Sequence, residues 1–380
     1  MLLNQLKQHL TNLPGWHTNR KIVVIESDDW GSIRMASKDA YERLYQKGYA
    51  VESCAFNRND ALENNEDLTL LAEVLNSVKD CHGKPAKLTI NNIVANPDFE
   101  RINAANFQSY FYEPFNQTLA KYPKSDKVMS IYHEGVAAEV FKPQFHGREH
   151  VNVVNWLKAL RSGDHFFTDA FSENMFSISR GKNSNCRYEC LDAMAAYTDT
   201  DSEYIKQSIL DGIKIFENIW GHKSFSVIAP CYSWHKSLEK TFLQGGIQHI
   251  QTGRVQKEQQ LDGRKTKIKR KWMGQSNKIG QIYTIRNVTF EPSVDINQDW
   301  VHQSFKEITT AFTWKKPAII ATHRLNYIGS IHPENRSRGL ILLKQLLQKI
   351  TFNWPDVEFM SSDQLGNLIK SENEKIIFPS

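Results

Sequence analysis

The sequence has few cysteines, little net charge and no long apolar segment. Its five cysteines are odd in number and scattered over 380 residues, which predicts free thiols rather than a disulfide framework and favours a reducing compartment. A net charge of +5 gives no reason by itself to expect a nucleic-acid partner. No apolar run approaches the ~18–20 residues of a transmembrane helix, and the polar N-terminus is unlike a signal peptide. These absences predict a cytoplasmic protein without a membrane span.

The one dense basic segment is "GRKTKIKRKW" at 263–272. A run of like charges is most often a solvent-exposed face, so we interpret this segment as a loop or hairpin, with a polyanion site as the alternative. We therefore expect no nucleic-acid partner, and the sequence does not define an oligomeric state.

Strand-like apolar runs alternate with longer helix-like stretches along the whole chain. The strand-like runs are 21–27, 87–94, 143–146, 224–230, 247–251, 281–290, 317–323 and 357–361. The helix-like stretches are 64–78, 151–161, 203–219, 236–244, 298–312 and 335–350. Such alternation is typical of a parallel α/β fold, either an open sheet or a barrel.

We expect residues 1–380 to form a single catalytic domain. The segment 98–145 is the least regular part and is rich in aromatic residues, which predicts an insertion or an excursion from the barrel rim. In α/β barrels the catalytic groups lie at the C-terminal ends of the strands. The residues that follow each strand-like run are therefore the candidates for chemistry.

The first strand-like run ends in paired carboxylates. The sequence "IVVIESDDWGS" at 22–32 places Asp28 and Asp29 directly after four β-branched residues. Adjacent buried carboxylates repel each other unless a cation or hydrogen-bond donors compensate. This pair therefore predicts a cation at the end of the strand.

A second strand-like run ends in "QFHGREH", with His146 and His150 separated by three residues. This spacing brings two imidazoles to one side of a turn, as a divalent metal requires. Asp29 supplies the anionic ligand beside these neutral ones, so the three residues together predict a metal site.

Two other metal chemistries fit part of this pattern. "HGREH" matches the H-x-x-E-H signature of inverted zinc peptidases, but Pro143 and Gly147 are unfavourable in the helix that such a site needs. Two histidines and one carboxylate also suit iron(II) oxygenases, whose usual jelly roll disagrees with the strand–helix alternation. Hydrolysis is therefore the preferred chemistry.

The run 317–323 ends in "THRLNY", which contributes His323, Arg324 and Asn326. Because the other two motif histidines are assigned to the metal, His323 is the natural proton donor, and Arg324 and Asn326 could orient it or contact substrate. Trp30 and Tyr232 are flat side chains suited to sugar rings, with ordinary packing at the rim as the alternative.

Together these residues resemble the polysaccharide deacetylase superfamily (NodB homology, carbohydrate esterase family 4). The first motif of that family is "TFDDG", in which the first Asp is the catalytic base and the second a metal ligand. "ESDDWG" is similar, with Trp30 inserted before Gly31, so the resemblance makes Asp28 the base and Asp29 a ligand. The second motif, H-[ST]-x-x-H, corresponds to His146 and His150.

The later motifs of the family match in order. The third, R-x-P-x-G, corresponds to "IAPCYSW", which keeps Pro230 and has Ile228 in place of the Arg. The fourth, D-x-x-D-W, is similar to "DINQDW" at 295–300, and the fifth supplies a His that matches His323. The missing Arg normally binds the base, and the candidates for its replacement are Arg34, Arg148 and Arg286.

The resemblance implies a deformed (β/α)7–8 barrel with long rim insertions and a metal-dependent hydrolase of acetylated carbohydrate. It implies a divalent metal, with zinc as the first choice, and an acetylated glycan or glycan precursor as the partner. The residues expected to contact that substrate are Trp30, Arg148, Pro230, Tyr232, Arg324 and Asn326. Two alternatives stay open: a glycoside hydrolase on a related barrel, which could recruit Glu26 or Glu291, and a barrel that binds carbohydrate without turnover.

Overall fold

The computed structural model describes residues 2–181 and 184–377, and its centre is a parallel β-sheet. Within these ranges nine strands form the sheet. They are β1 (Lys21–Trp30), β2 (Leu88–Ile93), β5 (Phe141–Gly147), β6 (Ser226–Ile228), β7 (His249–Thr252), β10 (Ile282–Ile285), β11 (Val288–Thr289), β12 (Ala318–His323) and β13 (Val357–Met360). Each pairing between neighbouring strands is parallel.

The two ends of this sheet are joined by one short stretch of chain. The strand order is β10-β7-β6-β5-β2-β1-β12-β11, with β13 paired to β1. Only Arg286 and Asn287 separate β10 from β11. The amide of Arg286 donates to the carbonyl of Thr252 in β7 (2.9 Å), and that of Asn287 donates to Ile319 in β12 (3.2 Å). The sheet thus curls into a barrel, and the predicted α/β barrel fold is confirmed.

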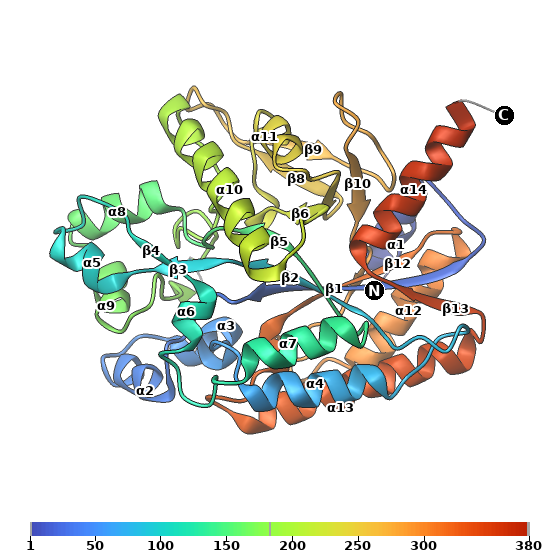
Figure 1. Cartoon of the computed structure of the whole chain (residues 1–380), viewed down its shortest axis with the longest axis horizontal. Helices are drawn as coiled ribbons and strands as arrows, with labels where there is room; N and C mark the ends of the chain where they lie inside the picture. The colour runs from blue at the N-terminus through green and yellow to red at the C-terminus, as the bar shows by residue number, and fades with distance from the viewer. Residues whose placement is uncertain (1, 182–183, 378–380) are drawn as a thin grey trace.

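Helices cover the outside of the barrel (Figure 1). The longer ones are α1 (Leu2–Asn12), α4 (Asn65–Asn76), α7 (Val128–Ala137), α10 (Asp199–Trp220), α12 (Trp300–Thr313), α13 (Pro333–Asn353) and α14 (Ser362–Ile377). The shorter ones are α2 (Lys38–Gln46), α3 (Ala55–Asn59), α5 (Phe99–Ala104), α6 (Phe115–Leu119), α8 (Val153–Arg161), α9 (His165–Ser172) and α11 (Leu238–Gln244). Across the described residues, none of the helices combines the length and the apolar character that crossing a membrane would take.

Local sequence explains where the central elements begin and end. The β-branched run 22–25 of β1 is almost completely buried, as expected of a strand covered on both faces. Thr198 and Asp201 form a capping box at the start of α10, and Gly221 ends this helix in the left-handed conformation, which glycine adopts without strain.

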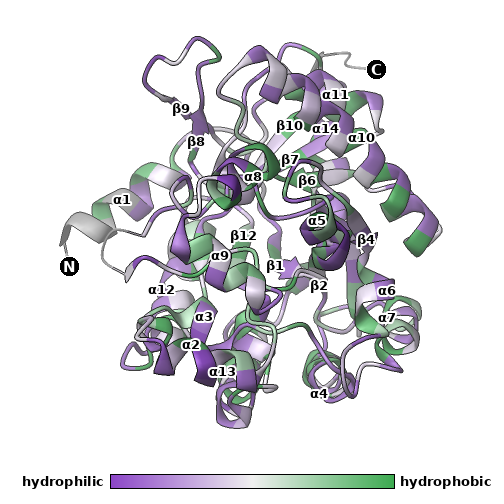
Figure 2. Cartoon of the chain, turned by 90° about the vertical axis from the view of Figure 1, so that its left-hand side faces the viewer, coloured by the Kyte–Doolittle hydropathy of each residue, from purple (hydrophilic) through white to green (hydrophobic). Residues whose placement is uncertain are grey.

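Two antiparallel hairpins extend from the barrel. One pairs β3 (Ala95–Pro97) with β4 (Tyr112–Pro114), and the other pairs β8 (Val255–Glu258) with β9 (Lys267–Arg270). All four residues of β9 are exposed, and Figure 2 shows this hairpin as a hydrophilic projection. The interpretation of the basic run as an exposed hairpin face is therefore confirmed.

Candidate active site

A cavity of about 340 Å³ lies at the C-terminal ends of the central strands. Its walls include residues from the ends of β1, β5, β6 and β12, together with the loop 184–191. The candidate residues among them are Asp28, Asp29, His146, His150, Tyr232 and His323. The structure therefore brings both proposed catalytic residues and all three proposed metal ligands into one cavity.

A break in the register of β1 lets Asp28 and Asp29 share this cavity. Successive side chains of a regular strand point to opposite faces, so two neighbouring aspartates should diverge. Here the pairing of β1 with β2 shifts between Ser27 and Trp30, and Asp29 adopts a positive φ of 75°. Asp tolerates this conformation better than most residues. The irregularity turns both carboxylates toward one cavity, and such strain is typical of functional sites.

Asp29, His146 and His150 form a tight cluster of metal-ligating atoms. Oδ1 of Asp29 lies 3.2 Å from Nε2 of His146 and 3.1 Å from Nε2 of His150. Ligands ~2.0–2.1 Å from a tetrahedral zinc ion would be ~3.3 Å apart. One ligand atom from each of the three residues lies within 4.8 Å of the others. The spacing therefore fits a divalent ion of this size.

Hydrogen bonding at His146 gives independent support for a cation at this cluster. Nδ1 of His146 lies 2.8 Å from the carbonyl oxygen of Ile228, and a carbonyl can only accept, so Nδ1 carries the proton. In the neutral ring Nε2 is then an unprotonated acceptor that faces the Asp29 carboxylate. Two acceptors 3.2 Å apart repel each other unless a cation lies between them. The second ring nitrogen of His150 is buried and has no hydrogen-bond partner among the residues that the structure describes.

The charge states of these side chains also suit the binding of a divalent metal ion. Burial acts against the Asp29 carboxylate, but positive charge at the two histidine positions outweighs it and holds the pKa of Asp29 well below the ordinary value. Burial lowers the pKa of His150, which favours the neutral imidazole that a metal binds. An anionic carboxylate beside neutral imidazole is the donor set of catalytic zinc sites.

Arg286 holds Asp28 in place. Its two terminal nitrogens donate to both oxygens of Asp28, each at 2.6 Å, and its Nε donates to Glu26 at 2.7 Å. Asn91 donates a further hydrogen bond of 2.8 Å to Asp28. Burial raises the pKa of Asp28, but Arg286 outweighs this effect and lowers it. Of the three candidate partners for Asp28, Arg286 is the one in contact.

His323 faces Asp28 across the cavity and is oriented by a carboxylate. Its Nδ1 lies 2.6 Å from Oε1 of Glu291, and its Nε2 lies 3.9 Å from Oδ2 of Asp28. Burial alone would lower the pKa of His323, but Glu291 outweighs burial and raises it to about 10. The ring is therefore protonated at neutral pH, with the Nε2 proton toward the cavity.

The segment 295–300, which matches the fourth motif of the family, lies outside the lining of the cavity. Asp299 of the segment 295–300 is exposed and caps the start of α12, so this segment does not reach the cavity. Glu291, which follows β11, orients His323 instead. Glu291 follows the strand-like run 281–290, which was a signal in the sequence, but we considered it only as a carboxylate for the glycoside hydrolase alternative.

Five of the six predicted substrate contacts are buried and lie outside the lining of the cavity. Trp30 and Arg324 are fully buried. Trp30 donates to Ser27 inside the core, and Arg324 binds the buried carboxylates of Asp60 and Glu63. Neither side chain lines the cavity, so neither can contact a substrate there.

Asn326 and Arg148 are likewise engaged within the protein. Asn326 is fully buried and donates to Glu291 at 2.7 Å, so it supports the partner of His323. Arg148 is buried against Glu149 and Tyr204. Pro230 is buried and outside the cavity lining, whereas Tyr232 lines the cavity and stays a candidate contact.

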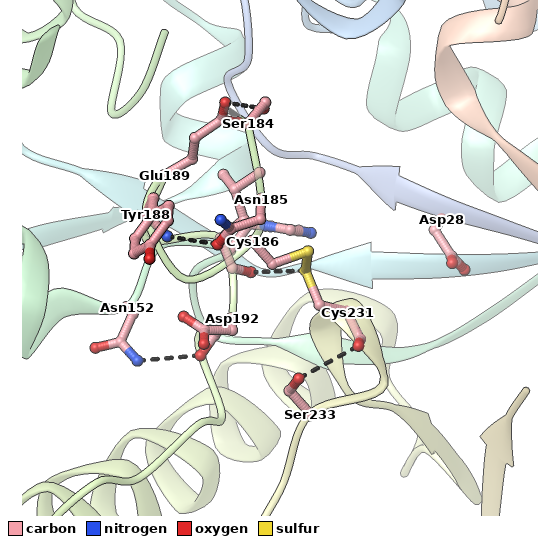
Figure 3. The surroundings of a disulfide bond; sticks show 12 residues. Asp28, Asn152, Ser184, Asn185, Cys186, Tyr188, Glu189, Asp192, Cys231 and Ser233 are labelled. Carbon is pink, nitrogen blue, oxygen red and sulfur yellow. Dashed lines mark hydrogen bonds between the residues drawn. A yellow bond between two sulfur atoms is a disulfide. The ribbon is translucent and has the colours of Figure 1, made fainter. Parts of the chain in front are cut away.

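A disulfide joins the cavity wall to the end of β6, contrary to the expectation of free thiols. Cys186 and Cys231 are bonded across 45 positions of sequence, and both residues line the cavity. Figure 3 shows this disulfide near Asp28, at the loop that carries Ser184 and Glu189. An odd number of five cysteines does not reveal such a pair, because cysteines remote in sequence can be neighbours in space.

The sequence matches no family model and no curated protein. The fold is similar to that of a Mycobacterium smegmatis protein assigned as a polysaccharide deacetylase, at 11% identity and a TM-score of 0.43 over 95% of this chain and 94% of that one. A family 4 carbohydrate esterase from Streptomyces lividans has 10% identity and a TM-score of 0.35, with coverage of 92% and 95%.

The chain is also similar to a 4-alpha-glucanotransferase from Thermococcus litoralis, at 9% identity and a TM-score of 0.42. It spans 40% of that enzyme's length, and 91% of this chain is covered. All three TM-scores lie below 0.5, so the function is argued from the geometry of the site itself. A cluster of metal-ligating atoms shares the cavity with Asp28, which is paired with Arg286, and with the protonated His323.

Proposed function

We propose that this chain is a metal-dependent hydrolase that removes an acetyl group, bound through nitrogen or oxygen, from a carbohydrate. The observation that carries the proposal is the cluster of Asp29 with His146 and His150, in which Oδ1 of Asp29 lies 3.1–3.2 Å from the Nε2 atoms of both histidines. A divalent ion, for which we propose zinc, would be held by these three residues and would supply Lewis acidity and an activated water.

The remaining cavity residues divide the proton transfers between them. Asp28 is kept ionised by Arg286, so it can accept the proton of the attacking water as general base. The new bond forms between the water oxygen and the acetyl carbon. As the bond to the sugar nitrogen or oxygen breaks, His323 donates its Nε2 proton to the leaving group. A backbone N–H near Cys231 or Tyr232 is the proposed donor to the oxyanion.

The glycoside hydrolase alternative has less support. It needs two carboxylates on either side of the glycosidic bond, and the candidates were Glu26 and Glu291. Glu26 is fully buried between Arg286 and Ser362, and Glu291 is occupied by His323 and Asn326. Neither lines the cavity. A barrel that only binds carbohydrate, without turnover, would not require a general base (Asp28) and a general acid (His323) in the same cavity.

The proposal also includes a substrate class, a domain organisation and a cellular location. We propose an acetylated glycan or glycan precursor as substrate and a single catalytic domain over residues 1–380, with 98–145 as a rim excursion. A cytoplasmic location stays a prediction, and the Cys186–Cys231 disulfide speaks against it, because disulfides persist mainly in oxidising compartments.

The test compares two neighbouring aspartates. Asp29→Ala removes the anionic ligand, so bound metal and acetate release should disappear together. Asp28→Asn leaves the three ligands intact and should keep the metal while acetate release falls ~10²–10⁴-fold, the usual contribution of a general base. The substrate is an acetylated amino-sugar oligomer, and thermal unfolding checks that both variants fold.

Asp295→Asn is the control, because Asp295 is an exposed carboxylate and its loss should change neither readout. If Asp28→Asn loses the metal and Asp29→Ala keeps it, the two roles are exchanged. If both variants keep metal and full activity, the hydrolase proposal is wrong.

A further inference from the structure

A second and larger cavity lies beside the hairpin that carries the basic run. Its volume is about 720 Å³, and its walls come from α11, the β8–β9 hairpin and the segment 275–283. We call it the lysine cleft, because its lining includes Lys206, Lys236, Lys240, Lys269, Lys271 and Lys278. Only two acidic residues, Glu239 and Glu258, lie among its lining residues.

Both of these acids already have partners. Glu239 accepts hydrogen bonds from the Tyr283 hydroxyl at 2.6 Å and from Asn277 at 3.0 Å. Glu258 lies 3.7 Å from the ammonium of Lys269. The cleft therefore keeps an excess of positive charge after its own acids have been accounted for.

Of the remaining lysines, Lys206 pairs with Glu203 at 2.5 Å, and the others have no such partner among the described residues. Lys236, Lys240 and Lys278 are exposed, and within the described part of the chain their ammonium groups make no ion pair or hydrogen bond. Lys271 lies over the ring of Tyr283 at 3.9 Å, also without an acid in direct contact. Burial lowers the pKa of Lys271, and an anion placed beside this ammonium would oppose that effect. The cleft is thus complementary to an anionic ligand.

The other lining groups favour a sugar chain over a nucleic acid. Proteins that bind single-stranded nucleic acids stack bases on aromatic side chains. The aromatic residue of this cleft, Tyr283, is 1% exposed and is covered by Lys271. Gln244, Gln275 and Ser276 instead line it with amide and hydroxyl groups, which suit the hydroxyls of a sugar.

The lysine cleft is connected to the active-site cavity by a short length of chain. Tyr232 lines the active-site cavity and Lys236 lines the cleft. Four residues of extended chain span at most ~14 Å, so the Cα atoms of Tyr232 and Lys236 cannot be further apart than this. Ser233 also forms a β-bridge with Lys257, next to the cleft residue Gln256. A chain of sugars could therefore occupy both places at once.

We propose that the lysine cleft binds the negatively charged part of an acylated glycan whose acetyl group enters the active-site cavity. The ligand chemistry is an anionic sugar chain, whether its charge comes from carboxylates or from sulfates. This inference rests on the proposed function for the location of the acetyl group, and it adds a substrate class to it. The basic run of the sequence thereby gains a role in binding.

Direct binding measurements test the cleft with a matched control. Oligogalacturonate and a sulfated oligosaccharide are titrated into wild type, into Lys236→Gln/Lys240→Gln/Lys278→Gln, and into Lys38→Gln/Lys306→Gln/Lys344→Gln. The control removes three exposed lysines outside the cleft, so both triple variants have the same net charge. The cleft variant should bind both oligosaccharides at least ~10-fold more weakly than wild type, and the control less than ~2-fold more weakly. Binding should also weaken as salt is raised.

The arms of the experiment give distinct answers. Tighter binding of one oligosaccharide identifies carboxylate or sulfate as the charged group. Equal affinity of the two triple variants, no binding of either oligosaccharide, or tighter binding of a single-stranded DNA oligonucleotide would each overturn the inference. Asp29→Ala should bind the oligosaccharides like wild type, because the cleft is separate from the metal ligands. A wild-type protein that binds the oligosaccharides in the cleft but releases no acetate from an acetylated substrate would refute the proposed function alone.

Discussion

Arg286 is the residue whose removal tests the electrostatics of the site most severely. Its side chain is 3% exposed and lies between Glu26 and Asp28, whose side chains are 0% and 7% exposed. Replacing it with Gln leaves Glu26 with the hydroxyl of Ser362, and Asp28 with the amide of Asn91 and with His323 at 3.9 Å. Breaking a buried ion pair in this way costs about 3–5 kcal/mol of unfolding free energy.

The cost of Arg286→Gln should depend on pH in a definite direction. In the wild type the pKa of Asp28 is lowered from 3.8, so its pairing contributes stability above that unfolded value, and this is lost as the pH falls through the folded value. In the variant, burial without Arg286 raises the pKa of Asp28 instead. The difference in stability should therefore be largest near pH ~7.5 and shrink toward pH ~4, as the carboxylates take up protons.

Urea unfolding of both proteins at several pH values measures this difference. Arg324→Gln is the matched control, because Arg324 is also a buried arginine between two carboxylates, Asp60 and Glu63, and does not line the cavity. It should lose similar stability, whereas Arg286→Gln should in addition lose activity per folded molecule. A cost below ~1 kcal/mol near neutral pH, or a cost that grows as the pH falls, would refute the reasoning.

Two further predictions concern the partner of His323 and the disulfide. Glu291→Gln removes the carboxylate that raises the pKa of His323 to about 10, so the loss of activity at high pH should move to lower pH in a pH–rate profile; an unmoved profile would exclude His323 as the acid. The same pairing stabilises the fold below the unfolded pKa of 6.5 and is lost as the pH rises through about 10. Cys186→Ser/Cys231→Ser opens a loop closed across 45 positions and should lose up to ~4 kcal/mol in urea unfolding without reductant; an unchanged midpoint would contradict a stabilising disulfide.

The fold was largely predictable because its signals are local. The buried run 22–25 of β1 and the amphipathic pattern of α10 lie in contiguous sequence, and both elements form as expected. The metal-ligand cluster was predictable for a related reason. His146 and His150 are close in sequence at the end of β5, and Asp29 lies at the end of β1 in the same parallel sheet. Because the C-terminal ends of parallel strands lie at one edge of the sheet, the three side chains meet there.

The contacts that the sequence could not single out join residues that are far apart in the chain. Glu291 and His323 are 32 positions apart, and Arg286 and Asp28 are 258 apart, so no spacing rule connects them. Trp30 was misplaced for a different reason. The positive φ of Asp29 interrupts the alternation of the strand, and the Trp30 ring then packs in the core near Tyr132. A pattern of alternating residues cannot anticipate such a break.

Metal binding is the most direct test of the central claim, that Asp29, His146 and His150 hold a divalent ion. Zinc is titrated calorimetrically into metal-free wild type, His146→Ala, His150→Ala and His323→Ala, and bound metal is measured by elemental analysis. The account predicts about one ion per chain in wild type and in His323→Ala, and loss of high-affinity binding in the other two variants. No ion in wild type, or an ion that depends on His323 and survives His146→Ala, would contradict it.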